Sequence, residues 1–144
     1  MTTRRVAGHA TTRTRPSRTE IHQHATLVQG VLTKLGQHAA GAKAGALTVT
    51  TVAAGAALTA RQPLAAAAGI AVVLALLVLD AGYLRQRRMY RRLYDAAVAG
   101  TAEWLSLDAR PYAAGCTWWA AIRSWAVLLP YLPLVAVLAA CAAL

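Results

Sequence analysis

Three long uncharged stretches divide the chain, and each is close to the length of a membrane-spanning helix. They cover residues 44–60, 64–79 and 124–144, which is seventeen, sixteen and twenty-one residues. A helix of about 20 mainly apolar residues crosses a hydrocarbon core that is about 30 Å thick. Because only residues 61–63 separate the first two stretches, we predict a transmembrane helical hairpin within residues 41–82. The third stretch predicts a further transmembrane helix within residues 118–144.

Residues 19–40 carry a different pattern, in which apolar side chains recur at alternating spacings of four and three. The positions are Ile21, Ala25, Val28, Leu32, Leu35 and Ala39. This spacing is typical of an amphipathic helix that packs on another helix, either the basic segment described next or a second copy. Ser17 or Thr19 can cap this helix, with Glu20 in its first turn. Residues 1–18 hold five arginines among Thr, Ser, Gly and Pro and predict a disordered basic tail.

The second uncharged stretch leads into a basic segment without a helix-breaking proline. Residues 85–92 contain five arginines. One long helix is therefore expected to leave the membrane and continue into water, and a basic helix with a polar connection covers residues 83–117. Tyrosines and arginines occupy separate faces of this helix, where they can contact anionic lipid headgroups or an acidic partner. These candidates are Tyr83, Arg85, Arg88, Tyr90, Arg92 and Tyr94.

Composition favours a membrane location and an orientation. The chain is 58% hydrophobic and 14% charged, whereas soluble domains carry about 25% charged residues. Its net charge of +10 is concentrated before residue 44 and in the basic segment, where headgroups are the expected partners rather than nucleic acid. By the positive-inside rule, the N-terminus and the basic helix are cytoplasmic and the hairpin turn is outside. The excess of arginine over lysine favours a bacterial source, so we expect the bacterial inner (plasma) membrane.

The polar residues offer little for catalysis or metal binding. No GxSxG, HExxH or phosphate-binding loop occurs, and the five acidic residues form no useful pair. His22, His24 and His38 are not spaced as ligands on one helix face and are expected on the solvated surface. Cys116 and Cys141 are expected to be ordinary apolar residues, with lipidation of Cys116 as the alternative. We therefore expect no enzyme, no cofactor and no metal site.

Small and hydroxyl-bearing residues distinguish the first uncharged stretch from the second. Gly41 and Gly45 form a GxxxG spacing and threonines follow, a composition that permits close helix packing and can line a polar path. Asp80 is the one acidic residue near membrane depth. It either influences ion passage or pairs with Arg85 or Arg87 at the surface. The candidate pore-lining or helix-packing residues are Gly41, Gly45, Thr48, Thr51, Gly55 and Asp80.

Residues 79–95 read LDAGYLRQRRMYRRLYD. This segment resembles the juxtamembrane segment of SLATT-type proteins, which are small two-transmembrane effectors of bacterial conflict and antiviral defence systems. The resemblance covers about residues 20–110. It implies a membrane hairpin that forms a pore or disrupts the membrane when a cytoplasmic sensor protein triggers it. The third uncharged stretch is not part of that pattern.

The sequence thus predicts an all-α membrane protein. It has a cytoplasmic N-terminal helix, a transmembrane hairpin that continues into a long basic cytoplasmic helix, and a third transmembrane helix. The expected function is a self-associating effector that forms a pore or disrupts the membrane. The alternative is a membrane anchor or scaffold that recruits a cytoplasmic partner through the Tyr/Arg helix. A small transporter subunit is a third option, but no internal repeat or broken helix favours it.

Overall fold

The computed structural model describes residues 17–103 and 106–143, and every regular element in these two ranges is helical. Two long antiparallel helices form its frame, α1 (Arg18–Ala60) and α2 (Pro63–Val98). The 3-10 helix η1 (Arg110–Tyr112), α3 (Trp118–Ile122) and α4 (Trp125–Ala143) follow. The predicted all-α fold is confirmed for this part of the chain. Of the predicted basic tail, residues 1–16 lie outside the described residues.

Local signals set the ends of the two long helices. At the start of α1, the Glu20 amide donates to Ser17 Oγ at 3.3 Å, and the Ser17 amide donates to the Glu20 carboxylate at 2.6 Å. This capping box lowers the pKa of Glu20 below its ordinary value of 4.5, first through the backbone hydrogen bond and then through the side-chain one. Between the helices, Arg61 adopts a left-handed conformation with φ of 50°, and Pro63 opens α2. The predicted cap and the predicted short turn are both present.

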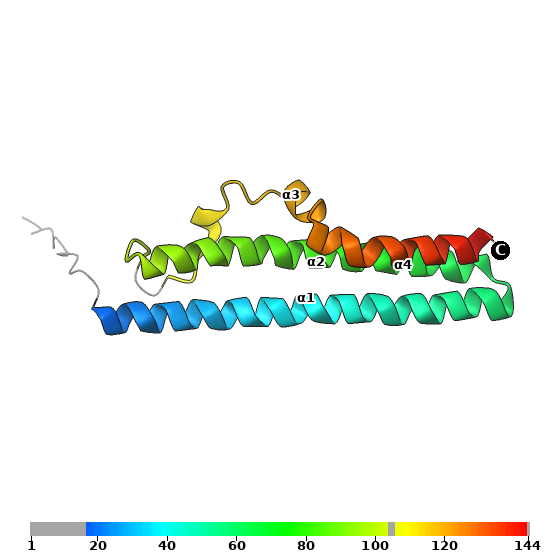
Figure 1. The fold of residues 1–144 in the computed structure, drawn as a ribbon, viewed down its shortest axis with the longest axis horizontal. Helices are drawn as coiled ribbons and strands as arrows, with labels where there is room; N and C mark the ends of the chain where they lie inside the picture. Colours follow the sequence, from blue (N-terminus) through cyan, green and yellow to red (C-terminus); the bar gives the residue numbers. More distant parts are fainter. Residues whose placement is uncertain (1–16, 104–105, 144) are drawn as a thin grey trace, which may run out of the picture.

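α1 is a single helix, which differs from the expectation of two segments. The boundary predicted between residues 40 and 41 is not a break in the backbone. Gly41 and Gly45 remain helical because a glycine inside a helix costs only about 1 kcal/mol relative to alanine. That amount is small beside the packing that α1 gains along the length of α2 (Figure 1).

α2 runs without a break from the apolar stretch into the arginine-rich segment, as predicted. α4 lies beside the half of α2 that is next to the α1–α2 turn, whereas η1 and α3 lie over the other half (Figure 1). The third helix predicted for residues 118–144 is divided into α3 and α4 at Arg123 and Ser124. Arg88 bridges the break, because its guanidinium donates to the Ala120 carbonyl of α3 and to the Ser124 hydroxyl within the break.

The buried side chains form two clusters. The first lies among α1, α2 and α4, with α3 at its edge, and consists of Ala46, Val73, Ala81, Ala121, Val127, Tyr131 and Leu138. The second joins the far ends of α1 and α2 to the connection and consists of Val28, Met89, Leu93, Ala109 and Cys116. Val28 and Leu32 of the apolar seam predicted for residues 19–40 pack here, on the basic part of α2. Because Cys116 is only 4% exposed, its lipidation is not compatible with this packing.

Two helices of the described residues, α2 and α4, are long and apolar enough to cross a membrane. In the most apolar 18-residue segment of each helix, only 28% of α2 and 17% of α4 is buried inside the protein. α1 is not one of the two. Its threonines, glycines and alanines give residues 44–60 a lower hydropathy than the apolar stretch of α2, so the first predicted span is the weakest by composition.

Candidate functional site: a buried ion pair between the long helices

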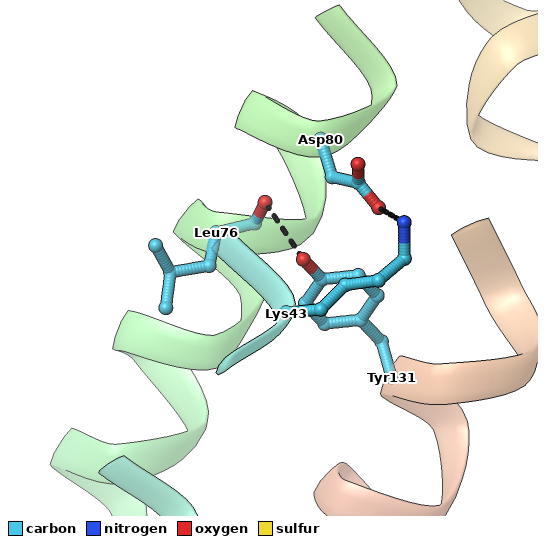
Figure 2. Close-up of polar contacts among 4 residues, drawn as sticks. All are labelled: Lys43, Leu76, Asp80 and Tyr131. Carbon is cyan, nitrogen blue, oxygen red and sulfur yellow. Dashed lines mark hydrogen bonds and ion pairs between the residues drawn. The ribbon is translucent and has the colours of Figure 1, made fainter. Parts of the chain in front are cut away.

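Asp80 of α2 and Lys43 of α1 form an ion pair between the two long helices. The Lys43 Nζ atom lies 2.9 Å from the Asp80 Oδ2 atom (Figure 2). Asp80 is 1% exposed, whereas the Lys43 side chain is 37% exposed. Each residue stands eighteen positions from the turn at Arg61 and Gln62, so the antiparallel helices bring the two side chains to the same level.

Charge, rather than an aligned hydrogen bond, holds this contact. Asp80 Oδ2 accepts no well-oriented hydrogen bond from the described residues, although the ammonium group is 2.9 Å away. We treat the contact as an ion pair because of its short distance. The three N–H donors of a lysine ammonium rotate freely, so a poorly oriented donor does not remove the attraction between the two charges. Desolvation costs several kcal/mol per buried ion, and the partner charge offsets this only while both groups are present. The pair therefore ties α1 to α2 at this level.

α4 adds a third polar side chain, Tyr131. Its side chain is 1% exposed, and its hydroxyl donates to the Leu76 carbonyl at 3.4 Å. Figure 2 shows this hydroxyl directed at the backbone of α2, one turn from Asp80. Each of the three apolar-region helices thus contributes one polar side chain to the same small volume.

A cavity of about 90 Å³ adjoins the ion pair. Side chains of α1, α2 and α4 line it, among them Lys43, Asp80, Tyr83 and Arg87. One water molecule needs about 10–15 Å³ of such space, so the cavity has room for water beside the carboxylate.

The prediction that Asp80 pairs with Arg85 or Arg87 is wrong. Arg85 points toward the connection, where its Nε donates to the Cys116 carbonyl at 2.8 Å and its guanidinium lies 5.7 Å from the Trp118 ring centroid. Arg87 lines the cavity but forms no ion pair with Asp80. The physical reason is the hairpin register, which places Lys43 of the neighbouring helix opposite the carboxylate, whereas both arginines lie further along α2.

Arg88 and Arg92, two more of the predicted contact residues, also bind the connection. Arg88 donates to the Ala120 carbonyl at 3.1 Å and to Ser124 Oγ at 3.2 Å. Arg92 donates to the Ala114 carbonyl. Carbonyls of an irregular segment lack helix partners and need donors, and arginine supplies several from one planar group. The face predicted to meet headgroups or a partner thus has an internal role that its sequence pattern does not reveal.

The predicted tyrosines lie toward α1 and the connection rather than facing open solvent. Tyr83 stacks on His38 of α1, with ring centroids 5.7 Å apart and ring planes inclined by 21°. Tyr90 and Tyr94 are half-buried against the second buried cluster. The tyrosine face therefore contributes to packing between α1, α2 and the connection.

His24 corrects another expectation. It is 3% exposed, and its Nε2 atom lies 3.0 Å from the Ser106 carbonyl oxygen, so it is not a solvated surface residue. His22 and His38 are exposed. Within the described ranges, no three His, Cys, Asp or Glu side chains gather in a way that could hold a metal ion.

Four candidate pore residues share an exposed face of α1, which we call the outer face: Gly41, Thr48, Thr51 and Gly55. No neighbouring element comes within 4 Å of a Cβ built on Gly41 or Gly55. The hydroxyls of Thr48 and Thr51 donate to carbonyls of their own helix, at 3.1 and 3.0 Å. Gly45 is half-buried at the edge of this face. Within one chain, the outer face and the buried carboxylate of α2 are therefore separate features.

Two of the three polar side chains of the site, Lys43 and Tyr131, are not among the predicted site residues. A signal for Lys43 is present in the sequence. A symmetric hairpin about Arg61 and Gln62 pairs it with Asp80. Tyr131 carries no comparable signal, since a lone phenol in an apolar stretch is compatible with any orientation.

Comparison with known proteins assigns no family to this chain. No protein-family model, curated protein or solved structure matches it.

Proposed function

We propose that this chain is a small integral membrane protein that self-associates through the outer face of α1 and opens a polar path across the bilayer. In this role it is a pore-forming or membrane-disrupting effector, the function expected from its composition. The observation that carries the proposal is the uncovered Gly/Thr face of α1, which runs alongside helices that expose apolar side chains. Such a face is unusual next to lipid unless another helix covers it.

Exposed apolar surface supports the membrane location. Leu64, Leu129 and Leu132 are 79%, 55% and 59% exposed. In water, a contiguous apolar surface of this kind marks a membrane or protein contact. Trp119 and Trp125 are 74% and 76% exposed near the arginine-rich end of the apolar region, where an interfacial aromatic belt is expected.

Packing supports α1 as a third crossing helix. Its residues 44–60 carry no charge and run antiparallel to the apolar stretch of α2. α2 and α4 bury one side of α1, so a less apolar composition suffices there. The positive-inside rule gives the arginine-rich end of α2, and with it the N-terminal end of α1, a cytoplasmic location, in the inner membrane of a bacterium.

A polar path requires several copies. The volume enclosed by one chain's three helices is filled by the first buried cluster. Glycines and threonines permit close approach of helix backbones, and the exposed hydroxyls of Thr48, Thr51 and Thr59 are polar groups that an assembly of α1 helices can use to line its centre. A cytoplasmic sensor protein, as the SLATT resemblance implies, is a candidate trigger for assembly.

Induced expression in bacteria with a voltage-sensitive dye tests this function. The wild-type chain is expected to depolarise cells and arrest growth, and the T48L/T51L variant to lose most of the depolarisation. V72L/V78L, which changes exposed valines of α2, is the matched control and should behave as wild type. Unchanged depolarisation by T48L/T51L at equal membrane abundance would contradict the pore.

The second candidate function is a membrane anchor or scaffold for a cytoplasmic partner. The observation in its favour is the second buried cluster, which gives the arginine-rich end of the hairpin a core of its own. A pore needs no such structure outside the bilayer. If this candidate is correct, the wild-type chain enters the membrane and leaves the membrane potential unchanged, and its partner is recovered by crosslinking from this end.

A further inference from the structure

A groove between α1 and α2 lies at the arginine-rich end of the hairpin and has no assigned role. Its volume is about 350 Å³, and its lining is Gln29, Leu32, Thr33, Arg87, Arg91 and Tyr94. The lining contains two cations and no acidic side chain. Five of the six residues carry side-chain hydrogen-bond donors, although the Thr33 hydroxyl already donates to the Gln29 carbonyl at 3.0 Å. This chemistry fits an anionic group with several oxygen atoms.

Arg87 and Arg91 differ from the other three arginines of the basic segment. Arg85 and Arg92 donate to carbonyls of the connection, and Arg88 donates to a carbonyl of α3. Arg87 and Arg91 are exposed, and neither forms an ion pair or a hydrogen bond with another residue of the described ranges. Four positions apart on one helix, they are neighbours on its surface. Two adjacent guanidinium groups are therefore available for an outside ligand.

The depth of the groove identifies the ligand. Arg87 also lines the cavity beside Lys43 and Asp80, and it stands seven residues after Asp80, or about 10 Å along the helix. Each headgroup layer of a bilayer is about 5–8 Å thick outside the hydrocarbon core. A long arginine side chain can reach back along the helix toward this layer. With the predicted hairpin ending at residue 82, Arg87 and Arg91 stand five and nine residues, or about 8 and 14 Å, further along the helix, so guanidinium groups that reach back come within reach of lipid phosphates.

We propose that this groove binds the phosphate headgroup of an anionic phospholipid such as phosphatidylglycerol. Arg87 and Arg91 bind the phosphate oxygens, since a guanidinium can donate two parallel hydrogen bonds to a phosphate. Gln29 and Tyr94 donate to the remaining headgroup oxygens, whereas the Thr33 hydroxyl donates to the Gln29 carbonyl and only lines the groove. The site rests on the proposed membrane location and is independent of pore formation.

Native mass spectrometry of the purified full chain tests this site. The protein in detergent is offered equal amounts of phosphatidylglycerol and phosphatidylcholine. The wild type is expected to retain phosphatidylglycerol at least several-fold better, and R87Q/R91Q to lose that preference. R18Q/R110Q removes two exposed arginines outside the groove and is the charge-matched control that keeps it. R87K/R91K, which keeps the charge without the planar fork, is expected to show a smaller preference than wild type.

Three results would overturn the lipid site. One is an unchanged preference in R87Q/R91Q with helicity equal to wild type by circular dichroism. Another is displacement of the lipid by an equal concentration of inorganic phosphate, which would indicate a site for a soluble anion. The third is the same loss of preference in R18Q/R110Q, which would indicate net charge alone. Membrane fractionation of each variant shows separately whether the protein is located in the membrane, so a result that contradicts the lipid site can be told from one that contradicts the membrane location.

Discussion

The two halves of the α1–α2 hairpin are packed by different means. Next to the turn, α4 provides a third apolar helix, and the first buried cluster fills the space between the three with Ala, Val, Leu and one Tyr. At the other end, an irregular connection takes the place of α4, and arginines of α2 hold it by its carbonyls. A regular helix brings its own backbone partners, whereas an irregular segment needs donors from elsewhere. The charge content of each half thus follows from the kind of element that covers it.

The Lys43–Asp80 pair stands at the border of the halves, and its removal should have the largest effect. K43M leaves Asp80 buried without a counter-charge, which costs about 3 kcal/mol of unfolding free energy, the lower end for a broken buried pair because Lys43 is 37% exposed. Thermal unfolding in detergent measures the loss. The double variant K43M/D80L removes both charges and should recover most of the stability. A single variant as stable as wild type would show that the pair does not hold α1 to α2.

The close approach of helices in the apolar half is tested at Gly69. A Cβ on Gly69 would lie 2.6 Å from the Ala53 Cβ and 3.3 Å from a Leu138 methyl group. G69A should therefore lower the unfolding free energy by about 1–3 kcal/mol, the usual effect of overpacking. G55A is the control, because its added methyl group meets open space and alanine favours the helix by about 1 kcal/mol. Equal stability of the two variants would contradict the close contact.

In the arginine-held half, R88Q should destabilise the segment that Arg88 contacts and leave the stability of the rest of the protein unchanged. Loss of the bonds to Ala120 and Ser124 is expected to weaken the local structure by about 1 kcal/mol, since the site is partly exposed and hydrogen bonds there exchange with water. Hydrogen exchange of residues 106–124 should accelerate while that of α1 stays unchanged. R91Q, one turn away and without a partner among the described residues, is the control. Faster exchange in both variants would contradict the specific role of Arg88.

The smallest effect is expected at the far end of α1. Because its hydrogen bonds lower the pKa of Glu20 in the folded state, the capping box stabilises the first turn above the ordinary pKa of a glutamate. That contribution is lost as the pH falls through the lowered pKa. The protection of residues 18–24 against hydrogen exchange, measured relative to the intrinsic rate at each pH, should therefore fall below about pH 4.5, and E20Q should remove this pH dependence. A wild-type pH profile in E20Q would exclude the capping box as its cause.

Much of the frame could be predicted from residue patterns, because long helices depend on local signals. The Ser17 cap, the turn at Arg61, the unbroken passage of α2 through Asp80 and the seam around Val28 all follow from spacing and charge. The continuity of α1 through Gly41 could not be predicted, since it depends on packing against α2 rather than on propensity.

The site was less predictable, because its partners come from different elements. The Lys43–Asp80 contact required the register of the hairpin. The contacts of Arg85 and His24 required the path of the connection, which no repeating pattern encodes. Polar side chains with carbonyl partners look the same in the sequence as polar side chains with none.

Release of a fluorescent dye from vesicles of defined lipid composition tests the central proposal most directly. The purified wild-type chain, inserted into phosphatidylglycerol-containing vesicles, is expected to release dye at a rate that rises more steeply than linearly with the protein-to-lipid ratio. T48L/T51L should insert equally and release little, while V72L/V78L should match wild type. Full insertion of the wild-type chain without release at any ratio would contradict a self-assembled polar path and favour the anchor.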